Sequence, residues 1–93
     1  MAFFSIIIPL YNKENFIENT IQSVLSQSFQ DFEIIIVNDG STDKSEEKVL
    51  QFKDDRIRYF SKKNEGASTA RNYGIEKASA HFTLVKPVSN LPP

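Results

Sequence analysis

The chain has 93 residues, with 11 Lys and Arg against 12 Asp and Glu, so its formal net charge is −1. This length allows one domain, and the balanced charge argues against a dedicated nucleic-acid-binding protein, which would carry a basic excess. Without cysteine and with a single histidine, the chain has no disulfide, no thiolate nucleophile and no site built from Cys or His ligands.

Four apolar segments predict the strands of a sheet. Residues 3–10 and 33–37 are continuous runs rich in Ile, Val and Phe, and such runs are typical of strands that are buried on both faces of a parallel sheet. A weaker third strand is predicted over 56–60, where apolar residues alternate with arginines, and a fourth over 82–85.

Helical patterns separate these strands. Residues 13–27 carry a stripe of apolar side chains at helical spacing, and Asn12 is predicted to cap that helix. A second helix is predicted over 43–52 with Asp43 as its cap. In a third helix, over 66–80, small residues recur every three or four positions, which would let the helix approach its neighbours closely.

The order β-α-β-α-β-α-β predicts an open, mostly parallel, Rossmann-like α/β sheet, followed by an irregular tail over 86–93. The fourth strand lies close to the end of the chain and is expected to be an uncovered edge. This predicts either the first half of a larger α/β domain or a homo-oligomer that forms through the edge. No apolar run is long enough for a transmembrane segment, and no signal peptide is predicted, so a cytoplasmic location is expected.

Ligands of open α/β sheets bind at the carboxyl ends of the strands. Three polar turns are expected to converge there, over residues 9–12, 38–43 and 62–66. None has the glycine pattern of a dinucleotide-binding fold or a P-loop. Phosphate would therefore have to be held by basic side chains or by a metal.

Three side chains of this edge of the sheet are candidates for ligand binding. Tyr11 can stack on a base, or it can simply cover the start of the first helix. Asp39 can accept hydrogen bonds from a base or a ribose, or it can form a turn before Gly40. Arg71 can hold a phosphate or a base carbonyl, or it can lie on a solvated helix face. For four other polar side chains no ligand contact is expected. Lys62 and Lys63 are expected to be solvated loop charges, Glu65 a helix cap, and His81 a polar residue at a strand edge.

Three stretches, over residues 4–12, 32–45 and 64–74, together resemble family 2 glycosyltransferases with the GT-A fold, and the likeness covers residues 3–85 in order and spacing. It implies that residues 1–85 are the half of a GT-A domain that binds a nucleotide sugar, commonly a UDP-sugar, for transfer to an acceptor hydroxyl. In such a site Pro9, Tyr11 and Asn12 would line the nucleotide pocket. Asp39, followed by Gly40, would recognise the uracil, and Arg71 would lie beside the base and the diphosphate. Some family members work at membranes, so a peripheral membrane location is a further expectation from the resemblance.

The fourth motif departs from the family pattern. Family members follow their fourth strand with an Asp-x-Asp motif that holds a divalent metal, whereas Lys86 and Val88 stand at those positions here, and neither side chain offers an oxygen ligand. No catalytic or metal-binding residue is therefore predicted, and Mg²⁺ or Mn²⁺ is expected only in a full-length family enzyme. The leading hypothesis is a fragment that binds the donor without catalysing transfer. The alternatives are a non-catalytic nucleotide-binding or self-associating module, and a remnant without function.

Overall fold

The computed structural model describes residues 2–88. Four strands form one fully parallel sheet in the order β3-β2-β1-β4, namely β1 (Phe4–Leu10), β2 (Phe32–Asp39), β3 (Ile57–Lys62) and β4 (Phe82–Val85). Three helices connect them, namely α1 (Ile17–Leu25), α2 (Ser45–Leu50) and α3 (Ala67–Lys77). The predicted α/β class and element order are confirmed.

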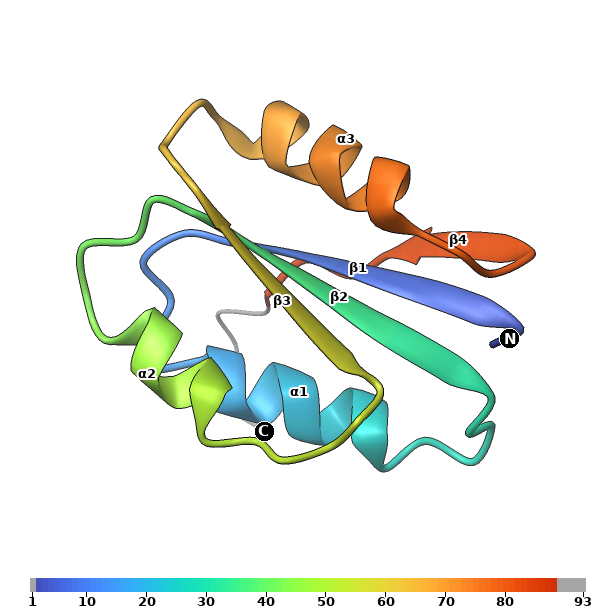
Figure 1. Cartoon of the computed structure of the whole chain (residues 1–93). Helices are drawn as coiled ribbons and strands as arrows, with labels where there is room; N and C mark the ends of the chain where they lie inside the picture. Colours follow the sequence, from blue (N-terminus) through green and yellow to red (C-terminus); the bar gives the residue numbers. More distant parts are fainter. Residues whose placement is uncertain (1, 89–93) are drawn as a thin grey trace.

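The helices form two layers around the sheet. Figure 1 shows α1 and α2 on one face and α3 on the other. The central strands β1 and β2 therefore have helices on both faces, and successive isoleucines alternate between them. Ile6 and Ile8 point toward α1, whereas Ile7 packs with Ala70 of α3. This double coverage explains why the two central strands are continuous apolar runs.

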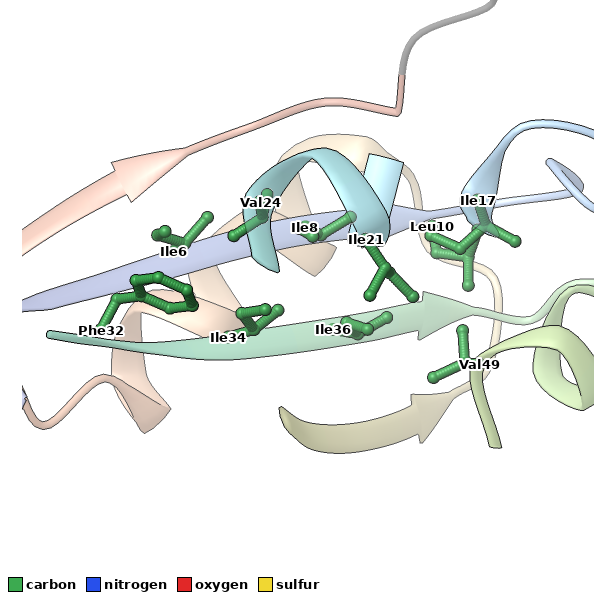
Figure 2. Packing of buried hydrophobic residues seen from close by; sticks show 10 residues of the cluster. All are labelled: Ile6, Ile8, Leu10, Ile17, Ile21, Val24, Phe32, Ile34, Ile36 and Val49. Carbon is green, nitrogen blue, oxygen red and sulfur yellow. The ribbon is translucent and has the colours of Figure 1, made fainter. Parts of the chain in front are cut away.

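The larger core lies between the sheet and helices α1 and α2. Figure 2 shows ten buried side chains of this core, from β1, β2, α1 and α2. Phe32 extends this core toward the start of the strands, and Val49 is the contribution of the short helix α2. Burial in this core fixes the positions of β1 and β2, and therefore the positions at which the turns after these strands begin.

Helix α3 packs on the opposite face at unusually short range. A Cβ atom at Gly74 would lie 2.5 Å from Cγ2 of Ile7 and 3.3 Å from Cγ2 of Val37. Only a residue without a side chain fits at this distance. The predicted close approach through small residues is confirmed, and it brings the start of α3 over the ends of β1 and β2.

The caps predicted for the first two helices need correction. Helix α1 begins at Ile17, four residues later than predicted, and Asn12 lies outside it with a positive φ of 48°. Helix α2 begins at Ser45, so Asp43 is one position too early for the cap. Its carboxylate instead accepts hydrogen bonds from the N–H groups of Ser45 (2.9 Å) and Glu14 (3.1 Å). Both side chains join separate turns, which a local pattern does not reveal.

Within residues 2–88, β4 is an edge strand that no other element covers, as predicted. All four of its residues are exposed, although the strand pairs with β1 along its whole length. Directly after β4, the N–H of Lys86 donates to the carbonyl of Ile7 in the middle of β1 (2.8 Å), and Val88 packs against the larger core. The rest of the predicted tail, 89–93, lies outside the described residues. No helix in the described part of the chain has the length and apolar character of a membrane span.

Candidate functional site

A pocket of about 490 Å³ opens at the carboxyl end of the sheet. The turns after β1 and β3 line it together with the end of β2, the start of α3 and the segment after β4. The lining residues are Pro9, Leu10, Tyr11, Lys13, Asp39, Asn64, Gly66, Ala67, Ala70, Arg71, Val85, Pro87 and Val88. Parallel strands end at the same edge of a sheet, so the three polar turns converge as predicted.

Four of the six predicted nucleotide-binding residues line this pocket, namely Pro9, Tyr11, Asp39 and Arg71. Tyr11 is 43% exposed at the end of β1, and Arg71 is exposed on the first turns of α3. In the described part of the chain the guanidinium of Arg71 has one hydrogen bond, from Nη2 to Oγ of Ser68 at 3.5 Å. Both side chains are therefore available to a ligand.

Asp39 is the most buried polar group of the pocket, with 3% of its surface exposed. Its Oδ1 accepts hydrogen bonds from the N–H of Glu65 (2.9 Å) and from Nζ of Lys62 (3.2 Å), and its Oδ2 accepts one from the N–H of Gly66 (3.1 Å). The carboxylate thus fixes the turn between β3 and α3. One acceptor position of Oδ2 remains, because a carboxylate oxygen has two lone pairs.

Lys62 was expected to be a solvated charge, and this expectation is wrong. Its side chain is only 11% exposed and makes ion pairs with Glu65 (2.9 Å) and Asp39 (3.2 Å). The hydrogen bond with Glu65, together with the one to Asp39, raises the pKa of Lys62 above its ordinary value. The lysine therefore stays charged and balances the buried Asp39. Glu65 pairs with it instead of capping α3, whose start has no side-chain cap.

Asn12 and Gly40 do not line the pocket, but they shape its rim. Asn12 joins two turns, since its N–H donates to Oγ of Ser41 (2.9 Å) and its Oδ1 accepts from the N–H of Thr42 (2.7 Å). Gly40 has a φ of 72°, and a Cβ there would lie 2.6 Å from the backbone nitrogen of Asn64. A glycine is needed because the third turn passes directly against the second.

Sequence reasoning missed Lys13, which lines the pocket from the turn after β1. Its backbone N–H donates to Oγ of Ser45 (2.9 Å), which holds this turn against the start of α2. The signal was its position directly after Tyr11 and Asn12, but the residue was assigned to a helix. Because α1 begins only at Ile17, Lys13 remains in the rim.

The oxygen donors of the pocket are few. Within residues 2–88 no group of three or more His, Asp or Glu side chains lies close enough to hold a metal ion. Asp39 is the one carboxylate among the lining residues, and Val88 contributes an apolar surface after β4. The chemistry of the site is thus an aromatic ring, a largely engaged carboxylate and two cationic side chains.

Comparison with known proteins shows which family this chain resembles in sequence and in fold. The model of glycosyl transferase family 2 matches residues 5–85. A Rickettsia bellii protein described as an uncharacterized glycosyltransferase is 50% identical over 80 residues, which are 84% of this chain and 11% of that protein. EpsJ of Bacillus subtilis, also described as an uncharacterized glycosyltransferase, is 50% identical over 80 residues, which are 84% of this chain and 23% of EpsJ.

A similar solved structure is that of S. aureus TarS 1-349 in complex with UDP-GlcNAc. It superimposes with a TM-score of 0.86 at 28% identity, over 92% of this chain and 26% of the TarS chain. The GT-A-like, Rossmann-like architecture is therefore shown. The chain spans about a tenth to a quarter of the length of these three proteins.

Proposed function

The chain belongs to glycosyl transferase family 2, and from this premise we propose that its pocket binds the nucleotide part of a nucleotide-sugar donor, with a UDP-sugar as the expected class. The observation that carries the proposal is the convergence of Tyr11, Asp39 and Arg71 on one pocket at the carboxyl end of a parallel sheet. The complex of S. aureus TarS with UDP-GlcNAc supports the choice of uridine.

Each of the three side chains has a chemical role in this proposal. The exposed ring of Tyr11 offers a face on which a base stacks. The free acceptor position of Asp39 takes an N–H of the base or a hydroxyl of the ribose. The guanidinium of Arg71, always charged, takes a phosphate oxygen or a base carbonyl. A pocket of about 490 Å³ is in the size range of small-molecule sites.

Donor binding does not bring sugar transfer with it. Transfer to an acceptor hydroxyl needs a base that takes the hydroxyl proton. Asp39, the one carboxylate that lines the pocket in the described part of the chain, already accepts three hydrogen bonds. We therefore propose that residues 2–88 bind the donor and do not transfer the sugar on their own.

The test is an NMR titration of ¹⁵N-labelled chain with uridine, which asks whether the nucleoside is recognised without its phosphates. We expect shifts at the three turns of the pocket, and an affinity that falls at least about fivefold in Tyr11→Ala, because one stacked base contributes about 1–3 kcal/mol. Tyr11 is exposed, so this variant should fold.

The matched control is Phe29→Ala, which removes an equally exposed aromatic ring that packs with Phe3 and Phe4 near the start of β1. It should leave uridine affinity unchanged. Equal affinities in the parent chain and Tyr11→Ala, or no shifts with uridine at all, would refute the proposal.

A second candidate function is self-association along β4, and one specific observation favours it. Phe82, Leu84 and Val85 are each more than 40% exposed, and Thr83 completes a strand without charge or proline. Edge strands usually carry such protective residues. A second copy could pair its own β4 with this edge, which would cover the apolar side chains of both.

A further inference from the structure

We propose that this pocket takes a nucleoside diphosphate without a divalent cation, and that Lys13 and Arg71 supply the positive charge for its phosphates. The inference rests on the proposed function, because it presupposes a nucleotide in the pocket. It departs from what the family resemblance implies, namely a metal on the diphosphate, and it follows from the donor set of this chain.

The carboxylate of the pocket is poorly suited to a metal. Magnesium prefers octahedral oxygen ligands and is commonly bound through one or two carboxylates together with phosphates. Asp39 already accepts hydrogen bonds from two backbone N–H groups and from Nζ of Lys62. A divalent ion at this carboxylate would meet the ammonium group of Lys62, which lies 3.2 Å from Oδ1.

As far as residue 88, the segment after β4 adds no oxygen side chain to the pocket. Val85, Pro87 and Val88 form this side of the pocket. The segment is held in place, because the N–H of Lys86 donates to the carbonyl of Ile7 (2.8 Å) and Val88 packs against the larger core. A metal would therefore face an apolar wall on the side where the family places its two carboxylates.

Two cationic side chains take the place of the metal charge. Lys13 reaches the pocket from the turn after β1, and Arg71 reaches it from α3, which packs on the other face of the sheet. Within residues 2–88 neither side chain takes part in an ion pair. Since Lys62 already balances Asp39, the charges of Lys13 and Arg71 remain available to an anion. Ionised hydrogen bonds to phosphate are about twice as strong as neutral ones.

The experiment compares uridine with UDP by calorimetry and NMR on the whole chain, in EDTA and in excess Mg²⁺. We expect UDP to bind equally well in both buffers, to within about twofold. Lys13→Met and Arg71→Met should each weaken UDP about fivefold, as expected for one partly exposed charge pair. Lys13→Met should leave uridine unchanged, and Arg71→Met should weaken uridine less than it weakens UDP. Rising salt should weaken UDP more than uridine.

The matched control is Lys53→Met, which removes an exposed lysine from the loop between α2 and β3, outside the pocket. It should affect neither ligand. A Mn²⁺ titration in the presence of UDP gives an independent readout, because a bound paramagnetic ion would broaden the amide signals of Glu65 and Gly66 beyond the broadening at exposed sites.

The outcomes separate the two proposals. Uridine binding together with UDP affinity that rises tenfold or more in Mg²⁺ overturns the inference and leaves the proposed function intact. Affinity for UDP that is unchanged in both lysine and arginine variants also overturns the inference. Binding of neither ligand overturns the proposed function, and the inference falls with it.

Discussion

Glu33 is a charged residue on the central strand β2, and its side chain is 11% exposed. Its Oε2 accepts hydrogen bonds from Oγ of Ser5 (2.5 Å) and from both the N–H (2.8 Å) and Oγ (2.9 Å) of Ser79, and its Oε1 pairs with Nη1 of Arg58 (3.1 Å). Burial raises the pKa of Glu33, but these hydrogen bonds together outweigh burial and hold the pKa below its ordinary value.

The first prediction concerns the acid stability that this residue confers. Because the folded-state pKa is lower than the unfolded one, the ionised carboxylate stabilises the fold above about pH 4.5, and this stabilisation is lost as the pH falls through the folded-state pKa. Glu33→Gln should lower the free energy of unfolding by about 1–3 kcal/mol at pH 7 and flatten its decline in acid.

Urea unfolding from about pH 7 to about pH 3 measures this effect. Glu76→Gln, an exposed glutamate on α3, is the control and should keep the parental profile. Arg56 lowers the pKa of Asp54 to about 2. Protonation of Asp54 therefore also lowers the free energy of unfolding in acid, and it does so equally in both variants. A Glu33→Gln profile parallel to that of the parent chain would contradict the prediction.

Residues whose partners are distant in the chain were the ones that sequence patterns misjudged. Lys62 reads as a loop charge, and its partner Asp39 lies 23 residues earlier. Asn12 fits the preference for helix caps, yet it joins Thr42, 30 residues later. In both cases a favourable local role lost to a hydrogen bond that exists only after the turns have converged.

At the scale of elements, α3 stands apart because it lacks an apolar stripe. Ala70 and Gly74 are its buried residues, and it packs on β1 and β2 by proximity of the backbones. The pocket depends on this packing, because Gly66, Ala67 and Arg71 belong to the start of the helix and line the site. A change at the contact should therefore affect stability and the site together.

The second prediction tests that contact with Gly74→Ala. Alanine favours a helix by about 1 kcal/mol over glycine, but its Cβ would lie 2.5 Å from Cγ2 of Ile7. Overpacking of this kind costs about 1–3 kcal/mol. We expect a net loss of stability in thermal unfolding, with amide shifts at the start of α3.

Asn72→Ala, on the exposed side of the same helix, is the matched control and should stabilise slightly. If Gly74→Ala were as stable as Asn72→Ala, the close approach of α3 to the sheet would not be a constraint on the fold.

For the whole molecule, the contrast between a well-covered centre and an open edge is the main feature. The strands β1 and β2 are almost entirely buried, whereas all of β4 is exposed. Aromatic rings extend the exposed surface around the start of β1 and β4, where Phe3 lies 5.1 Å from Phe82 between ring centroids. Exposed apolar side chains of this kind favour association between copies of the chain, and this association can be measured by sedimentation.

The third prediction is that sedimentation of the chain at tens of micromolar shows dimers that Thr83→Lys abolishes. A lysine on an edge strand opposes strand pairing, and Thr83 is exposed, so the variant should fold. Asn72→Lys places the same charge on α3 and should leave the dimer intact. A parent chain that sediments as a monomer would refute self-association through β4.

The sequence by itself determined the layer structure of this protein. Continuous Ile runs over 6–8 and 34–36 require cover on both faces, and small residues in the third helix allow one face to be covered at short range. Periodicity and turn residues are properties of short stretches of sequence. They therefore predict the seven elements, their order along the chain and the carboxyl end of the sheet as the place where the polar turns meet.

Only the tertiary structure decided the roles within the site. It showed that Asp39 holds the turn before α3, that Asn12 and Gly40 shape the rim, and that Lys13 joins Arg71 at the pocket. These roles depend on contacts between turns that are more than 20 residues apart. Such contacts form when the sheet brings the strand ends together, because the order of the strands in the sheet and the approach of α3 set which turns touch.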